Sequence, residues 1–183
     1  MKRTFKAEEY LRLAGQMAGR ATGTGRLQTA HLRRATSTAY YAVFHELVGQ
    51  GVRRVAGKGG DDHRHTVSRW YAHGNFRQTS RWVEAIGAKK SAPEVVTRLL
   101  SVNGRVDPDL ALLSESFGKL QQLRHAADYD PDYDAVRAET LEHVADAKTT
   151  IEAIRRLDLA NVHAFDMFLL LSLGGERMVR NSW

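Results

Sequence analysis

Uninterrupted helical periodicity is the sequence feature that most constrains the fold of this chain. Over residues 27–55 the apolar side chains recur at spacings of three and four, which places them along one face of an α-helix. They are Leu32, Ala35, Ala39, Val43 and Leu47. The alanines in this stripe allow a neighbouring helix to approach closely. The stretch therefore predicts one long helix that packs against others.

The rest of the chain shows the same periodicity in shorter segments and no strand-like alternation. Helices are expected over residues 7–19, 61–71, 76–86, 95–100, 107–129, 135–157 and 162–173. Asp61, Asp62 and Asp134 are expected to cap the helices that follow them. Residues 22–25 and 73–75 are expected to end the helices that precede them. The predicted fold class is all-α, an antiparallel helical bundle.

Length and composition limit the broad class of protein. The 183 residues fit one domain with a sizeable core, and there is no cysteine to form a disulfide or a thiolate metal site. The first sixteen residues contain acids and no long apolar core, so we expect no signal peptide, and a cytoplasmic location. Residues 165–173 are apolar but too short to span a bilayer. We expect a bundle over residues 1–157, and a packing or subunit-contact helix with its tail over residues 158–183.

The charge of the chain is unevenly distributed. Residues 1–90 carry 17 Lys and Arg against 6 Asp and Glu, a net charge of +11, whereas residues 91–183 carry a net charge of −5. A basic half predicts an anionic partner such as RNA or DNA. The alternative is that the two halves attract each other, within one molecule or between two.

Residues 120–130, LQQLRHAADYD, end an apolar helix with charged side chains. The apolar face is formed by Leu110, Leu113, Phe117 and Leu120. At about 100° per residue, Arg124 and Asp128 continue that face, where charges are costly unless paired or used. One interpretation is an internal ion pair that fastens the helix end. The other is a site that cleaves RNA without metal, with His125 activating the ribose 2′-hydroxyl and Arg124 holding the phosphate. Neighbouring helix residues diverge, so both side chains of one subunit are not expected to reach one phosphate.

The long helix carries a second, polar stripe, formed by Arg34, Thr38, Tyr41 and His45. It is either a polar seam facing Arg124 and Asp128, or a half-buried aromatic seam whose tips reach solvent or each other. His63 and His65 lack a third ligand at a suitable spacing, so no metal site is expected.

Basic and aromatic residues alternate over residues 69–82, namely Arg69, Trp70, Tyr71, His73, Arg77, Arg81 and Trp82. This mixture suits stacking on single-stranded RNA. It equally suits an ordinary amphipathic helix, and under that interpretation we expect Trp70 in the core.

Two segments together resemble the HEPN family. Residues 33–45, RRATSTAYYAVFH, are similar to its second-helix signature, and residues 123–130, LRHAADYD, resemble the fourth-helix segment of the branch in which Ala-Asp-Tyr follows Arg. Residues 70–74 also fit that branch, and the resemblance covers roughly residues 5–157. It implies a helical bundle that dimerises, with the paired fourth-helix motifs forming a cleft. Many members are metal-independent ribonucleases of toxin–antitoxin, phage-defence and CRISPR systems, and others bind RNA, nucleotides or proteins without catalysis.

In the nuclease members, the arginine is followed by four to six residues and then by a histidine. Arg124 matches the arginine, but Tyr129, Asp130 and Pro131 occupy the histidine positions. The resemblance leaves His125 and His45 as substitutes, beside the loop histidines 63 and 65.

Three functions follow from the resemblance and the charge. The first is an endoribonuclease of a toxin or antiviral defence system, with Arg124, His125 and His45 as catalytic residues. Its RNA cleft is expected to contain Arg34, Tyr41, Asp128, Tyr129, Arg69 and Arg77. The second is a non-catalytic module that binds RNA, a nucleotide or a partner protein such as an antitoxin. The third is a structural dimer subunit of a larger complex, with residues 165–173 in the contact. A homodimer is expected, and no cofactor, metal or membrane.

Overall fold

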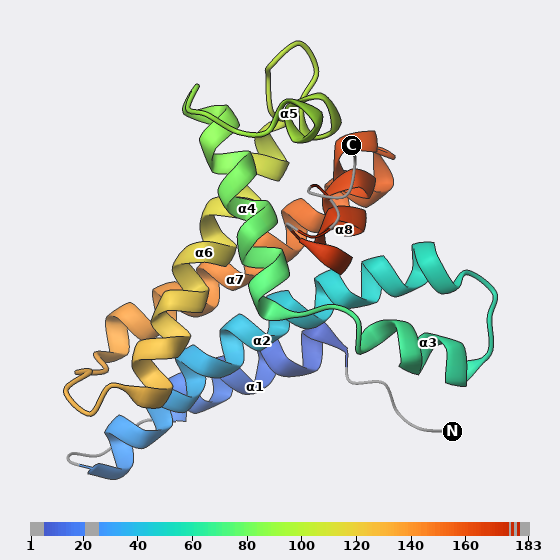
Figure 1. Ribbon diagram of the computed structural model, residues 1–183. Coiled ribbons are helices and arrows are strands. Elements are labelled where there is room, and N and C mark those ends of the chain that lie inside the picture. The colour runs from blue at the N-terminus through green and yellow to red at the C-terminus, as the bar shows by residue number, and fades with distance from the viewer. Residues whose placement is uncertain (1–5, 21–25, 176, 178, 180–183) are drawn as a thin grey trace. The chain divides into compact units, whose positions relative to one another are not determined.

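In a computed structural model the chain is built from α-helices, as its periodicity predicts (Figure 1). The structure describes residues 6–20, 26–175, 177 and 179. Within these residues there are eight helices and, apart from them, a single isolated bridge between Val102 and Arg105. The helices are α1 (Ala7–Arg20), α2 (Arg26–Ala56), α3 (Asp61–Ser68), α4 (His73–Gly87), α5 (Glu94–Leu100), α6 (Pro108–Tyr129), α7 (Arg137–Leu159) and α8 (His163–Gly174). The predicted all-α helical bundle is confirmed.

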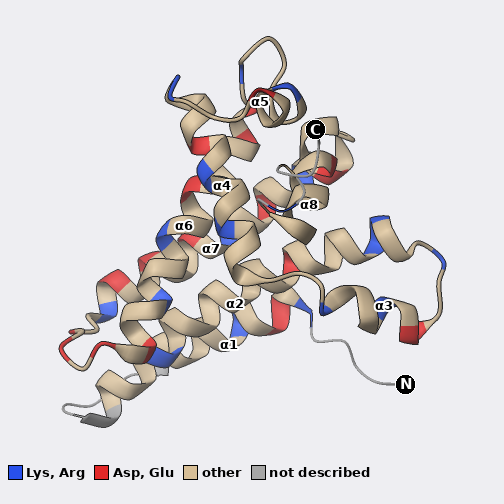
Figure 2. Cartoon of the chain, in the orientation of Figure 1, with Lys and Arg blue, Asp and Glu red and all other residues tan. Residues whose placement is uncertain are grey.

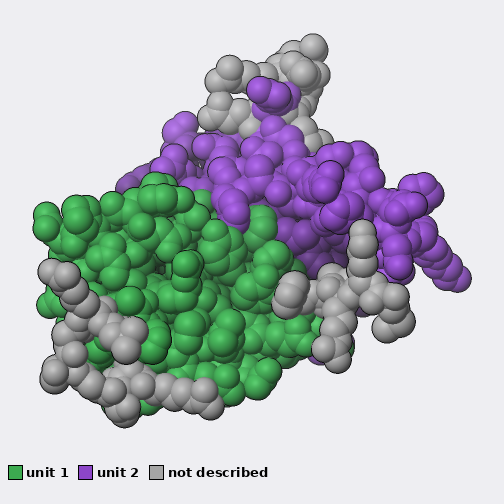
Figure 3. Space-filling view, turned by 90° about the horizontal axis from the view of Figure 1, so that it is seen from below, with its two compact units in different colours: residues 1–46, 116–152 green, residues 47–115, 153–183 purple. Residues whose placement is uncertain are grey.

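The chain divides into two compact units (Figure 3). Unit 1 comprises Met1–Glu46 and Ser116–Glu152, and unit 2 comprises Leu47–Glu115 and Ala153–Trp183. Helices α2, α6 and α7 each contribute residues to both units. The predicted C-terminal helix, α8, belongs to unit 2.

Unit 1 contains α1 together with parts of α2, α6 and α7. The Ser37 hydroxyl donates to Asp128 at 3.2 Å, while the Tyr40 and Phe117 rings lie 5.4 Å apart. Since a later residue of α2 meets an earlier residue of α6, the two helices are antiparallel. The α2 stripe is buried as predicted, from Leu32, which is 2% exposed, to Val43, which is fully buried. Packing of this stripe is what sets the orientation of the polar side chains described below.

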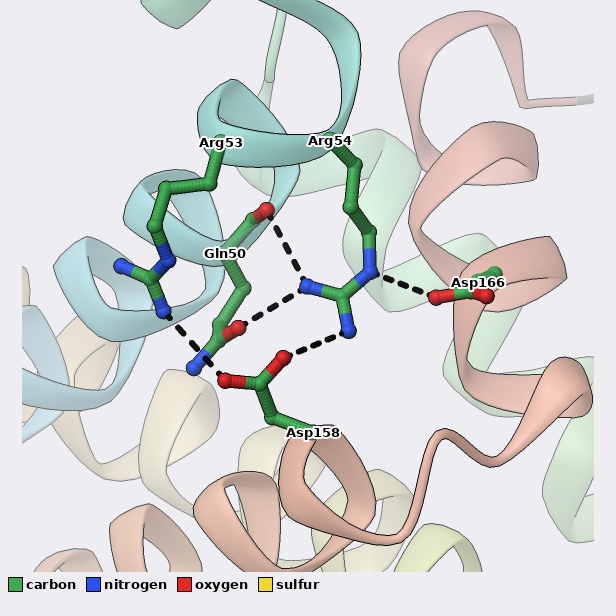
Figure 4. Close-up of polar contacts among 5 residues, drawn as sticks. All are labelled: Gln50, Arg53, Arg54, Asp158 and Asp166. Carbon is green, nitrogen blue, oxygen red and sulfur yellow. Dashed lines mark hydrogen bonds and ion pairs between the residues drawn. The ribbon is translucent and has the colours of Figure 1, made fainter. Parts of the chain in front are cut away.

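Unit 2 has an aromatic core. Its rings are Tyr71, Phe76, Phe168 and Phe165, with successive centroids 5.3, 6.1 and 6.5 Å apart. The Arg54 guanidinium lies over Phe165, 5.1 Å from the ring centroid. It donates to Asp166 at 2.5 Å, to Asp158 at 2.8 Å and to Gln50 Oε1 at 2.9 Å (Figure 4). One arginine thus joins the last turns of α2 to the end of α7 and the start of α8.

The expected end of the third helix is wrong. Residues 73–75 begin α4, whereas α3 already ends at Ser68. Asn75 is held in the helix by its side-chain amide, which donates to the Leu173 carbonyl at 3.1 Å, and by the Thr79 hydroxyl, which donates to the Asn75 carbonyl. A tertiary hydrogen bond therefore overrides the turn-like composition of this stretch.

The expected helix caps also need correction. Gly60, not an aspartate, is the N-cap residue of α3. Asp61 and Asp62 lie in the first turn of this helix, where their negative charges interact favourably with the positive end of the helix dipole. Helix α7 begins two residues later than expected, after Asp134 and after the buried Ala135. Residues 22–25, which were expected to end the first helix, lie outside the described residues.

Candidate functional site

Arg124 and Asp128 form the predicted ion pair at the end of α6. Arg124 Nε lies 2.9 Å from Asp128 Oδ2, and each side chain is 19% exposed. The contact is an ion pair without the alignment of a hydrogen bond. Asp128 also accepts a hydrogen bond from the Ser37 hydroxyl, so its carboxylate joins α6 to α2. The pair closes the buried face of α6, where Leu120 is fully buried.

Two tyrosines enclose the Arg124 guanidinium. Its Nη2 donates to Tyr41 Oη at 2.9 Å, and its Cζ lies 5.6 Å from the Tyr41 centroid and 5.3 Å from that of Tyr129. Partial burial opposes the charge, but the hydrogen bond to Tyr41 and the charge of Asp128 leave the pKa of Arg124 above its ordinary value. Arg124 is thus a permanent cation whose charge is balanced inside the unit.

His125 and Tyr129 form the exposed side of the same cluster. His125 is exposed, Tyr129 is 65% exposed, and their rings lie 5.0 Å apart. The side chains of Arg124 and His125 both contact the Tyr129 ring, although they project differently, Arg124 inward and His125 to solvent.

His45 lies on the other side of Tyr41. Its ring stacks on Tyr10 of α1 with centroids 4.7 Å apart and an angle of 21°, and its centroid is 6.3 Å from that of Tyr41. Burial lowers its pKa below the ordinary histidine value, so the neutral form is favoured. Tyr41 thus contacts both His45 and Arg124, which places the predicted polar stripe partly beside the pair.

The other members of the predicted stripe do not join the cluster. Arg34 is exposed, and the Thr38 hydroxyl donates back to the Arg34 carbonyl at 2.7 Å. Ser37, and not Thr38, contacts Asp128. The polar stripe therefore combines residues inside and outside the cluster, and Tyr41 is the residue that contacts Arg124.

Arg69 and Arg77 belong to unit 2, whereas the cluster around Arg124 lies in unit 1. Arg69 is exposed at the end of α3. Arg77 forms an ion pair with Glu84 at 2.7 Å, and its side chain is only 17% exposed. Arg77 is thus used within its own helix.

Sequence reasoning gave Arg33 no role, yet it organises the segment that follows α6. Its guanidinium donates to the carbonyls of Ala127 at 2.8 Å, Asp130 at 2.5 Å and Tyr133 at 3.3 Å. Carbonyls at a helix C-terminus have no partner within the helix, so Arg33 acts as a cap from another helix. The partners lie more than ninety residues away in sequence, so no local pattern indicates the contact.

The loop that follows the cluster in sequence is acidic. Asp130, Asp132 and Asp134 are all exposed there. Figure 2 shows these acids along the loop between α6 and α7. A polyanion approaching Arg124 from this side therefore meets like charges.

Acidification is expected to destabilise unit 1 through His45 and His143. Burial lowers the pKa of both below the ordinary value of about 6.5, and nearby Lys119 lowers that of His143 further. The unfolded chain therefore binds these protons more readily than the folded chain. The contribution of the two neutral histidines to folding stability is fully present above about pH 6.5. It is lost as the pH falls toward the pKa values that these histidines have in the folded protein.

Urea unfolding at about pH 7.5 and about pH 5.5 measures this loss, while Asp and Glu remain mostly ionised. His45→Phe keeps a ring against Tyr10 and cannot be protonated, so the difference between the two midpoints should shrink. A difference that the substitution leaves unchanged would assign the pH dependence to other groups.

No group of three His, Asp or Glu side chains in the part of the chain that the structure describes is placed to hold a metal ion. No single helix of residues 6–20 and 26–175 is long and apolar enough to cross a membrane; α7 and α8 meet that test only as a sharply bent pair. No family model matches the chain, and neither a curated protein nor a solved structure is significantly similar to it.

Proposed function

We propose that the chain is a HEPN-like helical module that binds RNA without cleaving it. The observation that carries this proposal is the state of Arg124, the residue that matches the family's catalytic arginine. Asp128 and Tyr41 contact its guanidinium, and three acids are exposed in the loop that follows α6. An arginine held in this way stabilises the bundle rather than a phosphorane.

The charge of the chain supports RNA as the ligand. Unit 2 carries 15 Lys and Arg against 10 Asp and Glu, a net charge of +5, and unit 1 has a net charge of +1. Most of the positive charge is thus separate from the Arg124 cluster. A homodimer and a protein partner, either an antitoxin or a subunit of a defence complex, belong to the same proposal.

One contact favours metal-independent cleavage as a second candidate. Arg124 and His125 both touch the Tyr129 ring, so a phosphate-binding group and a general base lie in one local cluster. Because the two side chains project differently, this mechanism needs His125 from one subunit and Arg124 from another.

Arg124→Ala separates the two candidates. For a binding module we expect RNA affinity to change by less than about twofold, because the Arg124 charge is already used internally. Stability should fall by about 1–3 kcal/mol, since Asp128 loses its cation in a partly buried place. The measurements are fluorescence anisotropy with labelled single-stranded RNA and urea unfolding, beside incubation of the wild type with total RNA in EDTA.

Intact RNA together with salt-sensitive binding supports the module. RNA cleavage that Arg124→Ala and His125→Ala both abolish establishes the second candidate instead. A wild-type protein that binds no RNA at low salt removes both.

A further inference from the structure

Trp70, in the turn that follows helix α3, has a solvent-exposed side chain. Of the eight residues of α3 only Val67 is buried, and Trp70 just beyond the helix is 54% exposed. The expectation that Trp70 lies in the core is therefore wrong, and Trp82, at 8% exposure, takes that place. A single exposed apolar side chain is common on protein surfaces, so a function for Trp70 rests on the charged residues beside it.

The backbone around Trp70 is anchored on both sides. The Trp70 N–H donates to the Val67 carbonyl at 3.0 Å and the Arg69 N–H to the Thr66 carbonyl at 3.2 Å. Tyr71 is 4% exposed and stacks on Phe76 with an angle of 12° between the rings. Because its two neighbours Val67 and Tyr71 are buried, Trp70 is presented to solvent from a fixed turn.

The stretch of chain that contains this turn is basic. Residues 53–105 carry 11 Lys and Arg against 4 Asp and Glu, a net charge of +7, which exceeds the +6 of the whole chain. Arg54 and Arg77 are neutralised by carboxylates. Other cations are exposed, and Figure 2 shows them on the loop before α3 and on α3 itself. We call Lys58, Arg64, Arg69 and Trp70, all of them exposed, the α3 surface.

Contacts within unit 2 hold this surface together. Arg64 Nη2 donates to the Gly57 carbonyl at 3.3 Å, which brings its cation beside the loop that carries Lys58. Arg69 directly precedes Trp70, and both lie in the turn that Val67 and Tyr71 anchor. Cations and an open aromatic face are thus presented by one short segment, which also carries the exposed Asp61 and Asp62 and has a net charge of +1 over residues 57–70.

We propose that the α3 surface binds single-stranded RNA, with Trp70 stacked on a base and the cations on the flanking phosphates. The combination of a basic surface and an open aromatic face is the one that single strands require, because every unpaired base offers a face for stacking. A duplex keeps its bases stacked inside and offers the indole no such face. This assignment rests on the proposed RNA binding and locates it in unit 2, whereas the Arg124 cluster belongs to unit 1.

Tryptophan fluorescence tests the stacking directly. Trp183 is first replaced, so that the Trp183→Phe protein retains Trp70 and the buried Trp82. An oligouridylate of about 20 nucleotides should then quench the emission, and Trp70→Phe in the same background should abolish the quenching. Quenching that survives Trp70→Phe, or equal quenching by a duplex RNA, overturns the stacking.

Anisotropy with the same labelled oligonucleotide tests the energetics. Trp70→Ala should weaken binding about tenfold, whereas Trp70→Phe retains most of the affinity. Arg69→Ala should reduce the slope of log K against log salt by about 0.7, as expected for one lost phosphate contact on a single strand. The matched controls are Leu159→Ala, at a side chain 82% exposed in the same unit, and Arg98→Ala, at one 70% exposed on α5; both should leave binding unchanged.

The outcomes separate the two proposals. If the wild type binds no oligonucleotide, the proposed function fails. If the wild type binds and Trp70→Ala and Arg69→Ala bind equally well, RNA binding stands and the α3 surface is wrong. If polyglutamate quenches Trp70 and the oligonucleotide does not, the surface takes an acidic protein, and the RNA assignment is overturned.

Discussion

Gly51→Ala is expected to destabilise the protein by about 2–3 kcal/mol, although alanine is the better helix former by about 1 kcal/mol. A Cβ at Gly51 would overlap the Tyr71 ring, and that ring is buried and stacked on Phe76. Neither the ring nor the α2 backbone has room to move without disturbing the aromatic core of unit 2. Urea unfolding measures the loss.

Gly49→Ala is the matched control in the same helix. The nearest atom to a Cβ there is the flexible end of Arg53, 3.7 Å away, so this substitution should be neutral or stabilise by up to about 1 kcal/mol. Equal stability of the two alanine variants would contradict the close packing of Tyr71 on α2.

The Tyr71 side chain supplies a second check on the same contact. Its hydroxyl is buried and forms no hydrogen bond within the described residues, and burial raises the pKa of Tyr71 to about 12. Tyr71→Phe should therefore be neutral or slightly stabilising. In a Tyr71→Leu background Gly51→Ala should cost less than in the wild type, because the overlapping ring is gone.

Arg33→Ala is expected to lower stability by about 2–4 kcal/mol, because one carbonyl in the last turn of α6 and two in the loop after it lose a charged donor together. The Arg33 guanidinium also lies 5.8 Å from the Tyr133 ring centroid, a contact that alanine removes. Arg33→Lys should recover little, since one ammonium group does not match the fork that reaches three carbonyls. Urea unfolding measures the loss of stability, and amide hydrogen exchange over residues 130–136 measures the opening of the segment that Arg33 holds.

Arg34→Ala provides the control one residue further along α2. Arg34 is exposed, so its removal should change stability by no more than about 0.5 kcal/mol. If both alanine variants are equally stable, the cap formed by Arg33 contributes nothing, and the loop after α6 is held by its own contacts.

The fold could be predicted wherever the deciding interactions are local. The α2 stripe fixes a long helix by spacing alone, and Asn103-Gly104 forms the expected turn, with both residues at positive φ. The Arg124–Asp128 pair could be predicted for the same reason, since its partners are four residues apart on one helix.

Interactions distant in sequence account for what the sequence did not predict. Asn75 stays helical because of a carbonyl 98 residues away, and Arg33 caps α6 across a similar separation. Trp70 and Trp82 occupy similar local patterns of basic and aromatic residues, and only the packing of unit 2 decides which of the two is buried. Long-range packing of this kind leaves no periodic signal in the sequence.

The passage of α2, α6 and α7 through both units has a consequence for synthesis on the ribosome. Unit 1 needs residues 116–152 to complete it, so Leu32 and the rest of the α2 stripe have emerged long before the helices that cover them. Unit 2 likewise waits for α8, at the end of the described chain. Neither unit can therefore complete its fold before its later segment has emerged, and until then the nascent chain exposes an apolar helix that chaperones can bind.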